Sequence, residues 1–179
     1  MTRLGADGRR TFSAACFAFG SVSAVILSGL VSSGQVQASA EKLLRTMAES
    51  PMWKLAAGGI LLPAVILLAG LSLAGGVLVP AATVLSGAAF GWAVSCLSRS
   101  GMPEPRTALL LSAAALPIIP AVILLGASGM RLSAMLRTVI LQGGVRQPDF
   151  RGELLRSAVS GAVIPLALLL LSLCLRSGI

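Results

Sequence analysis

The 179-residue sequence contains no histidine and no tyrosine, and only 11% of its residues are charged. Without histidine the chain has no imidazole for acid–base catalysis near neutral pH and no imidazole ligand for a metal ion. The scarcity of charge argues against a soluble domain, in which about a quarter of the residues are charged. Because 56% of the residues are hydrophobic, one soluble core of this size cannot hide the apolar surface, whereas a lipid bilayer accepts it.

Patterns typical of catalysis and metal binding are also missing. The three cysteines, Cys16, Cys96 and Cys174, form no CxxC pair and no spacing typical of secreted proteins. All six acidic residues lie in loops or at the ends of apolar stretches, so no two carboxylates share a membrane-buried face. No glycine-rich phosphate loop precedes a lysine. We therefore expect no enzyme activity, no catalytic residue, no cofactor and no metal site, and we disfavour proton-coupled transport.

What the sequence does contain is long uncharged stretches. Residues 11–40, 55–98, 107–130 and 157–175 lack lysine, arginine, aspartate and glutamate. A transmembrane helix needs about 20 mostly apolar residues, so three stretches hold one helix each and the second holds two. The sequence predicts an all-α fold, a polytopic integral membrane protein with about five transmembrane helices and short interfacial helices.

The predicted boundaries follow from charges, glycines and prolines. A cytoplasmic N-terminal head, residues 1–10, precedes a single membrane domain, residues 11–179. Within it we expect helices at residues 11–33, 55–74, 77–97, 107–128 and 157–175. Gly75 and Gly76 are expected to form the turn between the second and third helices. Residues 129–156 are expected to be an amphipathic loop, beginning as a continuation of the fourth helix along the lipid headgroups.

Small residues recur on two of the predicted helices. Gly20, Ala24 and Ser28 follow one another at every fourth position, and Gly87 and Gly91 form a GxxxG pattern. Small side chains on one face of a transmembrane helix allow another helix to approach closely. The first of these helices has an alternative interpretation as a cleaved signal peptide within residues 1–40, since Ala38-Ser39-Ala40 resembles a cleavage site.

The polar connection at residues 35–54 predicts a short helix at the membrane interface. Glu41, Arg45 and Glu49 are four residues apart and can pair along one side of it. Two interpretations remain open. The charges either form a solvated surface or provide a docking face for a partner.

The net charge of +8, from 14 basic and 6 acidic residues, fits loop cations at lipid headgroups. No basic patch interleaved with aromatic residues is present, so we expect no binding of nucleic acid. With the N-terminus in the cytoplasm, five spans place Arg3, Arg9, Arg10 and the five arginines of residues 131–156 inside, against six cations outside. The positive-inside rule therefore favours a cytoplasmic N-terminus and an external C-terminus.

Two further segments resemble a known family. The first is Ser86-Gly87-Ala88-Ala89-Phe90-Gly91, which ends the predicted hairpin. The second runs from Leu116-Pro117-Ile118-Ile119-Pro120-Ala121 through Gly126 and Gly129 to Arg131-Leu132. Together they resemble the stage II sporulation protein M family over about half of the chain, with Pro120, Ala121, Gly126, Gly129 and Arg131 in the family-like segment. The chain differs where many members have asparagine before the first motif glycine, since it has Ser86 there.

The resemblance implies a non-enzymatic scaffold in the bacterial cytoplasmic membrane. Members of this family help to localise peptidoglycan-degrading proteins during engulfment in endospore formation, and their partners are membrane-anchored cell-wall hydrolases. The alternative from the residues themselves is a membrane subunit of a transporter or permease. In that case Pro117 and Pro120, together with the glycine turn, would line a path through the membrane.

Overall fold

The computed structural model describes residues 5–31, 33–99, 105–142 and 150–176. In this part of the chain it contains six α-helices and no strand. They are α1 (Ala6–Leu30), α2 (Ser33–Glu49), α3 (Met52–Gly70), α4 (Gly75–Arg99), α5 (Pro105–Gln142) and α6 (Phe150–Arg176). All of them except α2 are long and apolar enough to cross a membrane. The prediction of an all-α, polytopic membrane protein with about five spans is confirmed.

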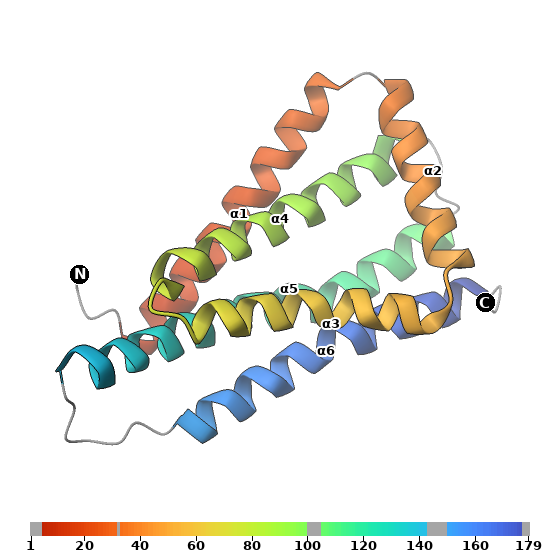
Figure 1. The fold of residues 1–179 in the computed structure, drawn as a ribbon. Helices are drawn as coiled ribbons and strands as arrows, with labels where there is room; N and C mark the ends of the chain where they lie inside the picture. Colours follow the sequence, from red (N-terminus) through yellow and green to blue (C-terminus); the bar gives the residue numbers. More distant parts are fainter. Residues whose placement is uncertain (1–4, 32, 100–104, 143–149, 177–179) are drawn as a thin grey trace.

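The five long helices run between two ends of a bundle, while α2 crosses from the end of α1 to the start of α3 (Figure 1). The arginine end is the one where α1 and α6 begin and α5 finishes. Its described arginines are Arg9, Arg10, Arg131, Arg137, Arg151 and Arg156. The α2 end is the opposite one, where α2 and the start of α3 lie with the last turn of α6. The chain thus crosses the bundle five times.

Two apolar clusters hold the bundle together. Phe17 of α1 packs with Ala121 and Val122 of α5 and with Ile164 of α6. The second cluster joins Ile66, Val79 and Leu125, which come from α3, α4 and α5. Many other large apolar side chains face outward, for example Phe19, Leu30, Leu68, Leu85 and Leu116. Such an outward apolar surface is expected where lipid surrounds the helices.

Several predicted boundaries need correction. Residues 6–10 of the expected N-terminal head already belong to α1, whereas residues 1–4 lie outside the described residues. The hairpin turn falls at residues 71–74, and Gly75 is the first residue of α4 rather than part of the turn. A Cβ on Gly75 would lie 2.7 Å from the Cβ of Ser133. Gly75 is therefore a site of close helix contact.

The predicted amphipathic loop at residues 129–156 is largely helical. Its first part, through Gln142, is the continuation of α5, and its last part, from Phe150, forms the first turns of α6. Residues 143–149 lie outside the described residues. Gly129, Leu132 and Ser133 are buried against the bundle. Residues 129–133 therefore pack within the bundle, whereas the side chains of residues 138–141 are exposed, and the position of this stretch along the headgroups stays a prediction.

Candidate functional site

The small residues singled out on α1 and α4 lie where these two helices meet. Gly20, Ala24, Gly87 and Gly91 are all buried. A Cβ on Gly20 would lie 2.9 Å from the carbonyl carbon of Val84, and one on Gly91 would lie 2.8 Å from the Cα of Ser21. Only glycine permits backbones to approach so closely, which makes this contact specific to these positions.

Hydroxyl groups support the same α1–α4 contact. Ser21 donates a hydrogen bond of 3.0 Å to the carbonyl oxygen of Gly87. Ser28 and Ser95 are hydrogen-bonded to each other through their side chains, and both are buried. Hydrogen bonds between membrane helices add modestly to packing, on average about 0.6 kcal/mol each. The glycine contacts therefore contribute most of the specificity.

The family-like segment lies on α5, and its residues do not share one environment. Ala121, Gly126 and Gly129 are buried, whereas Pro120 is exposed on the outside of the bundle. At Gly126 an added Cβ would lie 2.5 Å from the hydroxyl of Ser13 and 2.8 Å from that of Thr83. Here α1, α4 and α5 come together, and Ser13 donates a hydrogen bond of 2.9 Å to the carbonyl oxygen of Ile123. The buried members of the segment thus serve helix packing.

The residues expected to dock a partner lie on α2. Glu41, Arg45 and Glu49 are exposed, and Arg45 forms an ion pair of 2.9 Å with Glu49. Because both partners of this pair are largely in solvent, it adds little to stability. Near it, Lys42, Arg45, Thr46, Glu49, Ser50, Pro51 and Lys54 line a hollow of about 310 Å³. The charged side of α2 is therefore open to a partner.

The opposite side of α2 is fixed to the bundle. Val36 is completely buried and packs with Cys96 of α4, with Val31 and Trp92 partly buried beside them. At the other end of α2, Arg176 of α6 donates a hydrogen bond to the carbonyl oxygen of Ser50. The helix is thus held against α4 and α6 while its charged residues stay exposed.

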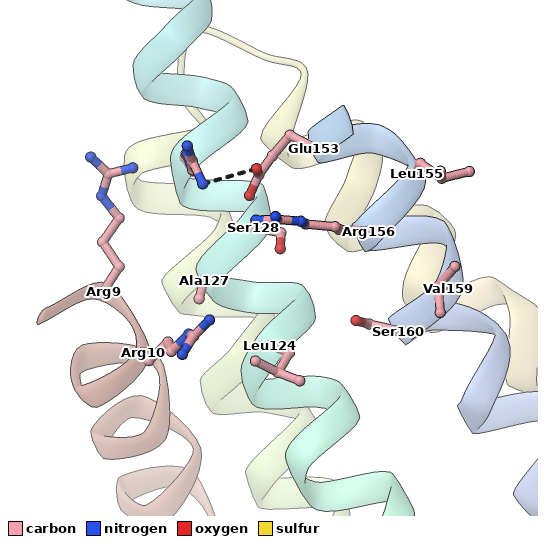
Figure 2. Close-up of a pocket in the computed structure, with 11 residues that line it drawn as sticks. Arg9, Arg10, Leu124, Ala127, Ser128, Glu153, Leu155, Arg156, Val159 and Ser160 are labelled. Carbon is pink, nitrogen blue, oxygen red and sulfur yellow. Dashed lines mark ion pairs between the residues drawn. The ribbon is translucent and has the colours of Figure 1, made fainter. Parts of the chain in front are cut away.

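A larger cavity, of about 470 Å³, lies at the arginine end between α1, α5 and α6. Figure 2 shows Arg10 on α1 and Arg156 on α6 pointing toward α5 from opposite sides. The complete lining consists of Arg9, Arg10, Leu124, Ala127, Ser128, Arg131, Glu153, Leu155, Arg156, Val159 and Ser160. We call it the arginine cavity.

One ion pair orders the wall of the arginine cavity. Arg131 of α5 lies 3.0 Å from Glu153 of α6, whose side chain is only 8% exposed. Within the described part of the chain, the structure records no ion pair for Arg9, Arg10 or Arg156. Four guanidinium groups therefore share a single lining carboxylate, and the cavity carries an excess of positive charge.

The sequence placed Arg131 in the family-like segment and treated the other three arginines only as headgroup cations. It did not bring Arg9 and Arg10 together with residues more than 100 positions away. One signal was present in the sequence. Arg10, Arg131 and Arg156 each directly border an uncharged stretch, and alternating spans bring these borders to the same end of the bundle.

No group of three or more cysteine, aspartate or glutamate side chains lies close enough to hold a metal ion among the residues described. Comparisons with protein-family models, with curated proteins and with solved structures find no match to this chain. The geometry of the two surfaces, the charged side of α2 and the arginine cavity, is therefore the basis for a functional argument.

Proposed function

We propose that this protein is a non-enzymatic membrane scaffold that holds membrane-anchored partner proteins against the exposed side of α2. One observation carries the proposal. Val36 fixes α2 to α4 through a completely buried contact, while Glu41, Arg45 and Glu49 remain in solvent. A helix that is immobilised on one side and charged on the other presents ready-placed groups to a partner, which lowers the entropy lost on binding.

The close packing of the bundle supports a role as a rigid platform. Backbone-to-backbone contacts at Gly20, Gly87 and Gly91 join α1 to α4, and Gly70 meets Gly129 between α3 and α5. A helix bundle with contacts this close has little freedom to open a path between its members. A rigid bundle suits a scaffold better than a transporter, which must open alternately to each side of the membrane.

The positions expected to line a transport path lie elsewhere. Pro120 is exposed on the outer surface, and Gly75 is buried against Ser133 of α5. Neither borders the arginine cavity or the hollow beside α2. The scaffold is therefore the function that we prefer over a transporter or permease subunit.

The resemblance to the stage II sporulation protein M family names the partners and the location for this proposal. The partners are cell-wall hydrolases anchored in the bacterial cytoplasmic membrane, and the setting is engulfment during endospore formation. The positive-inside rule places the arginine end in the cytoplasm and the α2 end, with the C-terminus, outside. On that side, α2 would face the compartment in which such hydrolases act.

Site-specific crosslinking tests this function. A photoreactive amino acid replaces Thr46, which is exposed on α2, or Thr138, which is exposed on α5 at the arginine end and serves as the matched control. After irradiation of membranes from sporulating cells, adducts are identified by mass spectrometry. We expect cell-wall hydrolases from position 46 and none from position 138. An ATPase captured at position 138, with no hydrolase at position 46, would instead support the permease subunit.

A further inference from the structure

Two arginines of the arginine cavity, Arg10 and Arg156, lie at similar distances from the α2 ends of their helices. At 1.5 Å per residue, Arg10 is about 30 Å along α1 from Leu30, and Arg156 is about 27 Å along α6 from Cys174. Leu30 and Cys174 end the two apolar spans there. Where these span ends mark one edge of a hydrocarbon core about 30 Å thick, the guanidinium groups of Arg10 and Arg156 lie at its opposite edge, beside the lipid phosphates.

One part of the arginine cavity has a charged and polar lining, and the other part has an apolar lining. Its headgroup-level part is lined by the arginines, with the hydroxyl groups of Ser128 and Ser160 next to them (Figure 2). Its remaining wall includes Leu124 and Val159, which are exposed on the outer surface of the bundle. A ligand that fills this cavity therefore needs an anionic group beside an apolar chain.

Arginine is well suited to such an anion. Its guanidinium group is always charged and donates paired hydrogen bonds that match the oxygens of a phosphate. Arg131 forms an ion pair with Glu153, and no ion pair is recorded for Arg9, Arg10 or Arg156 within the described part of the chain. Of these three, Arg10 and Arg156 point toward α5 from opposite sides (Figure 2). At the membrane surface, clustered arginines attract anionic lipid headgroups.

We propose that the arginine cavity binds an anionic phospholipid. Arg10 and Arg156 hold its phosphate from opposite sides, and an acyl chain lies along Leu124 and Val159. This site is separate from the proposed docking surface on α2, because the two lie at opposite ends of the bundle. The lipid-binding proposal can therefore be wrong while the scaffold proposal is right, and the scaffold proposal can be wrong while the lipid-binding proposal is right.

The test uses the full chain, purified in a neutral detergent and analysed by native mass spectrometry with added lipid. The probes are phosphatidylglycerol and phosphatidylcholine, with inorganic phosphate as the soluble competitor. Loss of a charge-assisted hydrogen bond costs about 1.5–3 kcal/mol, so R156Q is expected to weaken phosphatidylglycerol binding by about tenfold or more. R10Q is the second variant, and it is expected to have a similar effect.

R151Q is the matched control, because Arg151 is exposed on the same first turns of α6 but does not line the cavity. It is expected to bind phosphatidylglycerol like the unmodified protein, and phosphatidylcholine is expected to bind weakly to all forms. If R151Q and R156Q lost affinity for phosphatidylglycerol equally, that affinity would depend on general surface charge, and the proposal would be overturned. Displacement of the lipid by inorganic phosphate at equal concentration would overturn the assignment to a lipid.

Discussion

The guanidinium group of Arg137 on α5 donates a hydrogen bond of 2.8 Å to the carbonyl oxygen of Leu73, in the turn between α3 and α4. Ser133, one helical turn earlier on α5, donates a second bond of 3.1 Å to the carbonyl oxygen of Ser72. This turn has few polar side chains of its own, and a turn near lipid needs protein groups to pair with its backbone. The second transmembrane crossing after it, α5, supplies these groups.

Replacement of Arg137 by alanine should loosen this turn. The carbonyl oxygen of Leu73 loses its partner, and the turn opens more often, so hydrogen exchange of the backbone amides at residues 71–76 should become several-fold faster. Hydrogen-exchange mass spectrometry of the purified protein measures this directly. T138A is the matched control, because the Thr138 hydroxyl donates its hydrogen bond within its own helix, to the carbonyl oxygen of Ala134. Equal exchange in both variants would show that Arg137 does not hold the turn.

The glycine contacts predict a position-specific loss of stability. A Cβ at Gly87 would lie 2.9 Å from the carbonyl carbon of Phe17, so G87A should push α1 away from α4. Overpacking of this kind costs about 1–3 kcal/mol, and the thermal unfolding midpoint in detergent should fall by several degrees.

The control for this prediction is the same substitution at Gly58, which has no neighbouring atom within 4 Å of an added Cβ. Alanine favours a helix over glycine by about 1 kcal/mol, so G58A should leave the unfolding midpoint unchanged or raise it. A midpoint that falls equally in both variants would show that the α1–α4 contact is less tight than described.

The attachment of α2 depends on Val36. Exchange of this completely buried side chain for asparagine places a polar group against Cys96 and removes apolar burial worth about 1.5–3 kcal/mol. We expect V36N to release α2 from α4, with faster hydrogen exchange along α2 and loss of the crosslinks from position 46. A38N, at an exposed position of the same helix, should change neither. Crosslinks that persist in V36N would mean that partners recognise α2 without its fixed position.

Uncharged stretches were sufficient to predict the five spans, because lipid excludes charge from the middle of a transmembrane helix. The uncharged stretches did not predict where the helices begin and end. Residues 129–133 resemble the start of a surface segment, since Arg131 lies two residues after Gly129. In the structure Glu153 neutralises Arg131, and Gly129 packs against Gly70. Both partners are distant in sequence, so local patterns could not show that α5 remains in the bundle.

The candidate sites show the same limit. The i, i+4 spacing of Arg45 and Glu49 was enough to predict an ion pair on one side of a helix, since such pairing is local. The arginine cavity depends on three helices that meet at one end, and Arg9 and Arg10 on α1 are more than 100 residues away from its members on α5 and α6. Only the order of the spans, read together with the charge that borders each of them, connects Arg10 with Arg156.

The central claim, that α2 presents its charged side outside the cytoplasmic membrane, is tested most directly by cysteine labelling of intact cells. The background protein has alanine at Cys16, Cys96 and Cys174, and single cysteines replace Thr46 on α2 or Arg151 at the arginine end. With a membrane-impermeant maleimide, we predict that T46C is labelled in intact cells and R151C only after permeabilisation. Labelling of R151C but not T46C in intact cells would place α2 in the cytoplasm and contradict the scaffold for external partners.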